Sequence, residues 1–314
     1  MENVLVLSHK LIAIYLMVII GFFVSKNKAI GEYANDTISL ILNKVALPML
    51  ILATYARISL TKETIINAGI VICAALLVYL LNYGTARFFG KIFKFEEDRK
   101  VVLINGMVHA NTAFLAFPLL FQVFGEEGLF YGTMFYLADN LLLFSIGIKR
   151  LKPKDGTKNK LAPVTIALLF SIVMMIVCNL IGFDMSTTVF YDAANDIGAT
   201  TTPLAFIFLG MIIQQSNLKE IFMNKVVMFL MVIKMIIIPF IIIMLLYFSN
   251  LNLSVLIMLT IVIQSLMPPY SSLLAMAYEY KRDIELATSL VVLGHIFALI
   301  TIPVLFLYAN FLFK

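Results

Sequence analysis

Four ionisable side chains stand inside long apolar stretches of the sequence: Lys44, Asp139, Lys234 and His295. A charge at the centre of a lipid bilayer costs at least about 2.5–3.5 kcal/mol, so an ionisable residue at that depth is a functional candidate. Asp139 can carry a proton or hold a cation, and His295 can titrate near neutral pH. We predict that Asp139, Lys234 and His295 couple a proton or an ion to the protein's activity, whereas Lys44 is expected to be structural or to reach the membrane surface. The alternatives are a neutral carboxyl, a hydrogen-bonded core histidine and a lysine that reaches the membrane surface.

Polar side chains and prolines also gather at two places in the apolar stretches. A proline inside a helix removes one backbone hydrogen bond and clashes with the preceding turn. In membrane proteins, helices interrupted at matching positions present half-helix N-termini, whose free N–H groups and partial positive charge suit an anion. Packing kinks and polar contacts between helices are the alternative explanation. We predict a substrate-binding site formed by Asn111, Thr112, Pro118, Asn140, Pro268, Pro269, Tyr270, Ser271 and Ser272.

Other chemistry finds little support in the sequence. Cys73 and Cys178 lie in apolar segments without a His or Cys partner at metal-ligand spacing, and the three histidines are scattered. The chain has no glycine-rich phosphate loop, no paired-cysteine motif and no His-Glu-x-x-His motif. We therefore expect no enzyme activity, no cofactor and no metal site.

The composition places these residues in a membrane protein. Hydrophobic residues fill 62% of the 314 positions, and charged residues fill only 13%. Soluble domains average about 45–50% apolar and about 25% charged residues. The net charge of +5 is spread over short loops rather than gathered in a basic domain, so nucleic acid is not an expected partner. The expected surroundings are a lipid bilayer.

Ten apolar segments can cross a bilayer core, which needs roughly 20 residues per helix. Most of the 23 Lys and Arg residues lie in the loops that follow the odd-numbered segments. Because cytoplasmic loops carry the excess of basic residues, we predict a multi-pass protein of the cell membrane with both termini outside. The predicted helices cover residues 9–25, 36–56, 64–89, 100–122, 128–149, 161–182, 193–215, 221–248, 253–279 and 284–311.

The longest connection divides the chain into a first repeat of five helices (1–149), a basic cytoplasmic loop (150–160) and a second repeat of five helices (161–314). An odd number of helices per half gives the halves opposite orientations in the membrane. The predicted fold is therefore all-α and integral to the membrane, with about ten transmembrane helices in two inverted repeats. The fourth helix of each half is broken, at Asn111 and Pro118 in one and at Pro268–Pro269 in the other.

Short motifs run along almost the whole chain. They are NKVALP at 43–48, NTAFLAFP at 111–118, FGEEGL at 124–129, TPLA at 202–205 with LG at 209–210, Lys234 with Pro239, and the stretch 268–277 followed by TIP at 301–303. In this order and spacing they resemble the auxin efflux carrier family, which includes bacterial permeases and the PIN auxin exporters.

The resemblance implies a scaffold formed by the first, second, sixth and seventh helices, which would form a homodimer. The third to fifth and eighth to tenth helices would form a mobile transport unit, in which the fourth and ninth cross at their breaks. Asn111, Pro118, Pro268 and Pro269 match the family's crossover positions. We expect a secondary transporter that moves small organic carboxylate anions by an elevator-type alternating-access mechanism.

Three alternatives stay open. A sodium- or proton-coupled symporter of the bile-acid-transporter type shares the inverted-repeat plan, with Asp139, Asn140 and Gln264 as its cation-site candidates. A channel can also be lined by broken helices. A membrane receptor or interaction protein could use the basic loop to hold a partner.

Overall fold

The computed structural model describes residues 2–27, 31, 34–152, 162–215, 222, 224–249 and 251–314. Within these residues the regular structure is helical, without a β-strand. Seven helical spans in the described part are long and apolar enough to cross a membrane, and residues 12–26 and 255–265 form shorter apolar helices. The prediction of an all-α integral membrane protein is confirmed. Most of the predicted basic loop, from residue 153 to 160, lies outside the described residues.

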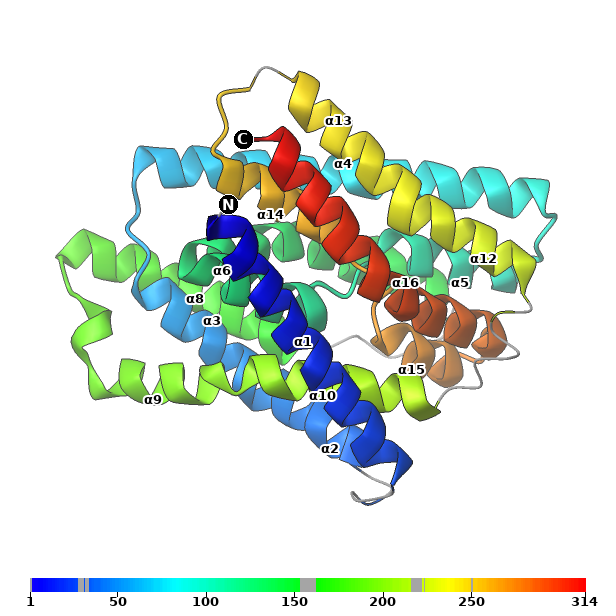
Figure 1. Ribbon diagram of the computed structural model, residues 1–314, viewed down its shortest axis with the longest axis horizontal. Coiled ribbons are helices and arrows are strands. Elements are labelled where there is room, and N and C mark those ends of the chain that lie inside the picture. Colours follow the sequence, from blue (N-terminus) through cyan, green and yellow to red (C-terminus); the bar gives the residue numbers. More distant parts are fainter. Residues whose placement is uncertain are drawn as a thin grey trace. The chain divides into compact units, whose positions relative to one another are not determined.

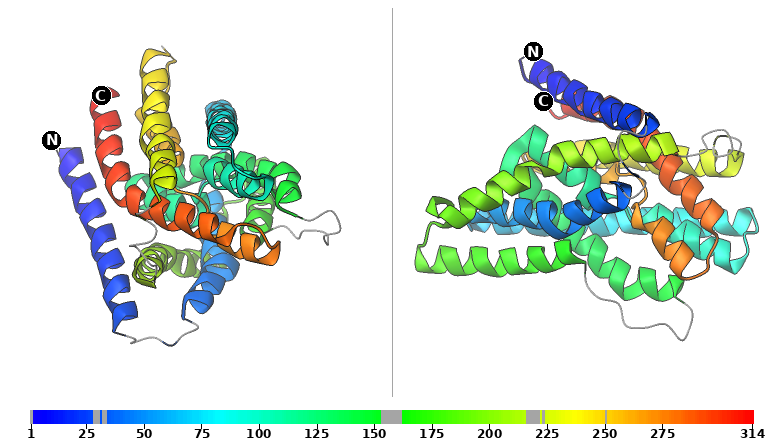
Figure 2. Two further views of the ribbon diagram at one scale, coloured as in Figure 1. Left: turned by 90° about the vertical axis from the view of Figure 1, so that its right-hand side faces the viewer. Right: turned by 90° about the horizontal axis from the view of Figure 1, so that it is seen from below.

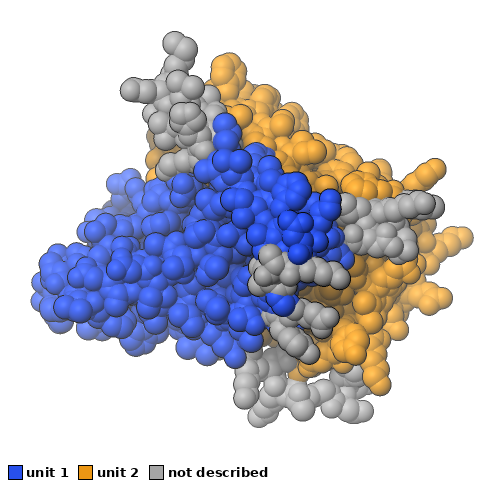
Figure 3. Space-filling model, turned by 60° about the horizontal axis from the view of Figure 1, so that its bottom comes forward, with its two compact units in different colours: residues 1–71, 113–137, 161–215 blue, residues 72–112, 138–160, 216–314 orange. Residues whose placement is uncertain are grey.

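The chain forms two compact units that alternate along the sequence (Figure 3). Unit 1 comprises Met1–Val71, Ala113–Leu137 and Leu161–Gln215. Unit 2 comprises Ile72–Thr112, Ala138–Lys160 and Ser216–Lys314. The grouping of helices into a scaffold and a transport unit stays a prediction.

Unit 1 is built on the close packing of its first and last helices. Its helices are α1 (Glu2–Lys26), α2 (Ala34–Ile41), η1 (Leu42–Ala46), α3 (Leu47–Ala56), α8 (Pro163–Ile181), η4 (Met185–Thr187), α9 (Val189–Ala199) and α10 (Thr201–Gln215), with part of α6. A Cβ on Gly21 would stand 2.0 Å from the Ile207 carbonyl oxygen, and one on Gly210 would stand 2.0 Å from that of Val18. Small residues let membrane helices approach this closely, and α1 lies against α10 in Figure 1.

Unit 2 holds the C-terminal third of the chain and the middle of its first half. Its helices include α5 (Glu97–Val108), η3 (Leu143–Gly147), α7 (Ile148–Leu151), α12 (Lys225–Val232), η5 (Ile233–Ile237), α13 (Ile238–Phe248), α14 (Val255–Ser265), α15 (Ser272–Glu279) and α16 (Ile284–Leu312). Two long helices, α4 (Lys62–Ile92) and α6 (Phe117–Leu142), contribute to both units, and α6 turns at Gly125 (φ 68°). Figures 1 and 2 show α12 and α13, in yellow, beside α16, in orange and red.

Prolines inside three helices each follow a short π-helical segment. The segments η1, η2 (Thr112–Ala116) and η5 end two residues before Pro48, Pro118 and Pro239. In η5 the amide of Ile238 donates to the carbonyl of Ile233, five residues back. The wider turn shifts the hydrogen-bond pattern just before a residue that has no N–H to donate. Each helix therefore continues through its proline.

Both predicted helix breaks exist, but the first break does not include Pro118. The second lies between α14 and α15 and contains Pro268 and Pro269. The first is confined to residues 109–111, between α5 and η2. Pro118 is the second residue of α6 and belongs to unit 1, so its predicted place in the break is wrong. The span predicted at 193–215 is divided between α9 and α10.

Candidate functional site

The two helix breaks meet in unit 2 through their backbones. The amide of Asn111 donates to the carbonyl of Pro268 across 2.8 Å. Ala110 and Pro269 form an antiparallel bridge beside this bond. Backbone groups freed by a break in a membrane helix must find partners inside the protein. Here each break supplies a partner to the other, so two interruptions far apart in sequence form one crossing.

Asn111 connects three segments at this crossing. Its side-chain nitrogen donates to the Ser271 hydroxyl at 3.0 Å and to Nε2 of His295 at 2.8 Å. Nδ1 of His295 lies 2.7 Å from the carbonyl of Val291, one turn earlier in α16. Because Nε2 accepts and Nδ1 donates, the imidazole is neutral in this arrangement. Asn111 is 5% exposed and His295 is 1% exposed, so the network is screened from solvent.

Tight packing against α16 fixes the second break. A Cβ on Gly294 would stand 2.4 Å from Cδ of Pro269, so only glycine lets the Pro268–Pro269 segment lie this close to α16. A continuous apolar core extends from α5 through α12 and α15 to α16, with Met107, Leu230, Leu273 and Leu290 fully buried. The crossing therefore rests on a rigid support rather than on a surface loop.

A buried acid and histidine pair lies next to the first break. Nδ1 of His109 is 2.8 Å from Oδ1 of Asp139, and their side chains are 2% and 8% exposed. The rings of Tyr79 and Tyr270 lie about 6 Å from the imidazole, at 5.9 Å and 6.0 Å. The pair satisfies the carboxyl of Asp139 inside the apolar core, where an unpartnered carboxylate would be costly.

Lys234 reaches the same break from η5. Its ammonium group donates to the carbonyl of Met107 at 2.6 Å, in the last turn of α5. The residue is only 2% exposed. The alternative of a lysine that extends to the membrane surface is therefore wrong for Lys234.

Hydrogen-bond donors without a fixed charge converge where the second break ends. Ser271 and Ser272 begin α15, and the first amides of a helix have no acceptors within the helix. Together with the helix dipole, such amides favour a negatively charged ligand. Ser271 accepts a hydrogen bond from Asn111, and its own hydroxyl hydrogen can be donated to a ligand beside the backbone amides that begin the helix. In the described part of the chain no arginine bonds to these residues, so a carboxylate that binds here can also be released.

Most predicted site residues fall in this part of unit 2. Thr112 and Asn140 belong to unit 2 and are buried, at 1% and 6% exposure, and Tyr270 donates from its hydroxyl to the sulfur of Met276. The structure brings together Asn111, Pro268, Pro269, Ser271 and His295, and it places Asp139 and Lys234 at the neighbouring end of α5. Their roles in binding and coupling stay predictions.

Three groups that contribute to this part of unit 2 could not be identified from the spacing of residues in the sequence. His109 stands in the predicted helix 100–122, and its pairing with Asp139 joins it to a residue of another predicted helix. The Met107 carbonyl is a backbone group, and Gly294 acts by having no side chain. The signal that could have pointed to Gly294 is its place directly before His295 in an apolar stretch.

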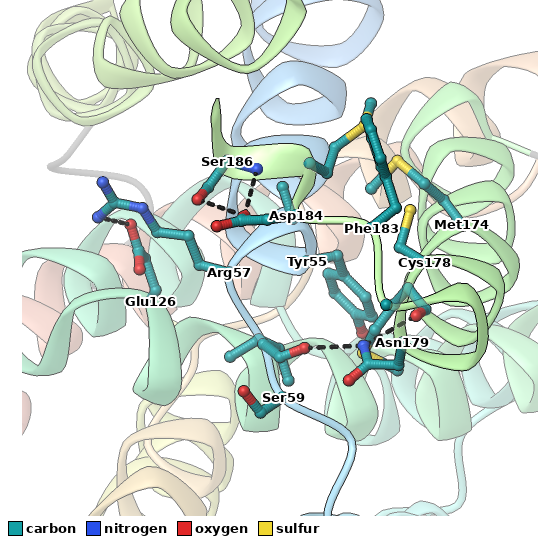
Figure 4. Close-up of a pocket in the computed structure, with 15 residues that line it drawn as sticks. Tyr55, Arg57, Ser59, Glu126, Met174, Cys178, Asn179, Phe183, Asp184 and Ser186 are labelled. Carbon is teal, nitrogen blue, oxygen red and sulfur yellow. Dashed lines mark hydrogen bonds and ion pairs between the residues drawn. The ribbon is translucent and has the colours of Figure 1, made fainter. Parts of the chain in front are cut away.

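Unit 1 contains a separate cavity of about 630 Å³ beyond the ends of α3 and α8 (Figure 4). The Asn179 side chain there bonds the carbonyl of Ile58 and the amide of Leu60. The Ser186 hydroxyl and amide both donate to Asp184 and lower the pKa of its carboxyl, so Asp184 is charged at neutral pH. Arg57 pairs with Glu126 at 2.9 Å. These polar groups stabilise the loops and helix ends around the cavity.

No group of three or more His, Cys, Asp or Glu side chains that could hold a metal is found in the part of the chain that the structure describes.

Comparison with known proteins places the chain among transport proteins. The model of the membrane transport protein family matches residues 6–160 and 148–306. An uncharacterized transporter of Methanothermobacter thermautotrophicus is 21% identical over 301 residues, which cover 94% of this chain and 96% of that protein.

Proposed function

Because the chain belongs to the membrane transport protein family, we propose that it is a secondary carrier of small organic carboxylate anions and binds them at the crossed breaks of unit 2. The observation that supports this most is the pair of broken helices whose backbones bond to each other at Asn111 and Pro268. In transporters, interrupted helices with free half-helix ends form the substrate site near the middle of the membrane.

The chemistry of the donors favours a carboxylate over a bulkier or more highly charged anion. The donors are two hydroxyls and the backbone amides that begin α15, and Asn111, whose side-chain N–H groups are bonded to Ser271 and His295, positions Ser271. A hydrogen bond to a charged carboxylate is stronger than one between two neutral groups. A few neutral donors therefore suffice for binding. A carrier must also release its substrate, and neutral donors allow release.

Movement of the site is part of the proposal. We infer that the third to fifth and eighth to tenth predicted helices carry the bound anion through the membrane by an elevator-type motion. The first, second, sixth and seventh would serve as the scaffold, and scaffolds would pair in a homodimer. The protein would lie in the cell membrane with both termini outside. Labelling of single cysteines placed at the two termini, in intact cells, tests this orientation.

Flux measurements in proteoliposomes test the function. Purified protein is given a panel of monocarboxylates and dicarboxylates, with and without proton and sodium gradients. Saturable flux of a carboxylate supports the proposal, and dependence on either gradient identifies a coupled symporter. No flux across the panel contradicts a carboxylate carrier and favours a receptor, whereas unsaturable ion current favours a channel.

A matched pair of variants tests the site. Asn111→Ala removes the bonds to Ser271 and His295, and we expect it to reduce kcat/KM for the transported anion by about tenfold or more, the loss of one or two hydrogen bonds. Asn82→Ala is the control, because Asn82 is also a buried asparagine of unit 2 and bonds only the carbonyl of Val78 in its own helix. Equal flux from the two variants would show that the crossing is not the binding site.

A further inference from the structure

The ammonium group of Lys234 replaces a hydrogen bond that the first break removes. In a continuous helix the amide of Asn111 would donate to the carbonyl of Met107, four residues back. Here that amide is turned to the carbonyl of Pro268, and Nζ of Lys234 lies 2.6 Å from the Met107 oxygen instead. The contact therefore has a definite structural origin: one backbone oxygen loses its helical donor and receives a cation.

The position is electrostatically suited to a cation. The C-terminal end of a helix carries a partial negative charge, which favours positive groups. Asp139 belongs to the same end of α5, because its carboxyl is bonded to His109, the residue that directly follows this helix. In the described part of the chain Lys234 forms no salt bridge with a carboxylate, so its main bond is to the helix end.

Burial distinguishes Lys234 from the other lysine that lies in a π-helical segment. Lys234 stands in η5, whose wider turn precedes Pro239. Its side chain runs through the interior to the end of α5 and is 2% exposed. Lys44 offers a contrast within the same chain, because it also lies in a π-helical segment before a proline but is exposed.

In carriers with broken helices, the C-terminal ends of half-helices and the unwound carbonyls are where a coupling cation binds. We propose that Lys234 is a tethered cation that takes the place of a coupling sodium ion at the end of α5, so that transport requires no sodium. The proposal rests on the function proposed above. A sodium ion cannot share the Met107 oxygen from the same side while Nζ occupies it.

Removing the lysine is expected to create a need for a free cation. Wild-type flux should be the same in sodium, potassium and choline buffers. Lys234→Ala, which leaves room at the end of α5, should lose flux by about tenfold or more in choline, because a buried negative helix end is left uncompensated. Sodium or methylammonium at millimolar concentration should then restore a substantial part of the flux. Lys44→Ala is the matched control and should behave as wild type in every buffer.

A second measurement does not depend on transport. In detergent, sodium or methylammonium should raise the midpoint of thermal unfolding of Lys234→Ala by about 2 °C or more, because a ligand that binds the folded state stabilises it. Neither ion should shift wild type. Lys234→Met, which fills the space without a charge, should not respond to either ion.

The outcomes separate the two proposals. Sodium-dependent flux in wild type, full flux of Lys234→Ala in choline, or a loss that no cation restores would each overturn the tethered cation. If wild type carries no carboxylate at all, the proposed function fails. The unfolding measurement still decides on Lys234 in that case, because a cation response confined to the alanine variant supports the tethered cation and its absence overturns it.

Discussion

The cavity of unit 1 and the crossing of unit 2 are both polar, yet their polar groups do different work. Around the cavity, Arg57 and Glu126 form an ion pair with side chains 50% and 26% exposed. At the crossing, His109 and Asp139 form a pair that is 2% and 8% exposed. Water can replace the partners of the first pair but not those of the second. Exposed polar groups around a cavity are therefore a weaker sign of a binding site than a buried network that compensates for broken helices.

The largest effect is expected at the buried pair. Asp139→Ala leaves His109 without its partner in the apolar core, and the loss of one member of a buried pair costs about 3–5 kcal/mol. We expect a lower midpoint of thermal unfolding in detergent and loss of flux. Asp139→Asn keeps an oxygen at the same place and should lose less stability. If the alanine variant is stable and fully active, the buried pair contributes no more to stability and flux than the exposed pair of Arg57 and Glu126.

An intermediate effect is expected where α16 supports the second break. Gly294→Ala puts a Cβ 2.4 Å from Cδ of Pro269, and overpacking of this kind costs about 1–3 kcal/mol. The displaced break should also raise KM for the transported anion. Gly84→Ala is the matched control, because a Cβ there meets no other atom within 4 Å. Similar behaviour of the two alanine variants would show that the break tolerates movement.

The smallest effect is expected in unit 1. Arg57→Ala removes an exposed ion pair and a contact with the Tyr191 ring at 5.0 Å. Exposed pairs contribute about 0–1 kcal/mol, so thermal unfolding should shift by little. Flux and KM should be unchanged. A strong rise in KM in this variant would indicate that the substrate binds at the cavity of unit 1 rather than at the crossing of unit 2.

The sequence predicted an all-α membrane protein because the bilayer imposes the length and hydropathy of its helices, whereas the count of ten stays a prediction beside the seven long spans of the described residues. The break at Pro268–Pro269 was also predictable, since two consecutive prolines cannot continue a helix. Pro118 misled the prediction because the π-helical segment before it absorbs the missing donor, while the chain breaks earlier, at residues 109–111. One proline can therefore be carried within a helix, and a break can occur without one.

The partners at the crossing were beyond prediction for a geometric reason. Asn111 meets Ser271 and His295 across separations of 160 and 184 residues, and Lys234 meets a backbone oxygen 127 residues away. Hydrophobic periodicity describes one helix at a time and carries no information on which helices meet. The residue types could be identified as candidates, but their pairing required the structure.

The bond between Asn111 and Pro268 also affects how the chain is inserted into the membrane during its synthesis. The first break is synthesised and inserted long before the segments that complete it, because Lys234 and Pro268 lie in the C-terminal third of the chain. Unpaired backbone groups inside lipid cost several kcal/mol each. The nascent chain must therefore be sheltered by water or by the insertion machinery until α14 arrives. A chain that stops before α12 is expected to be removed by membrane quality control rather than to persist as half a carrier.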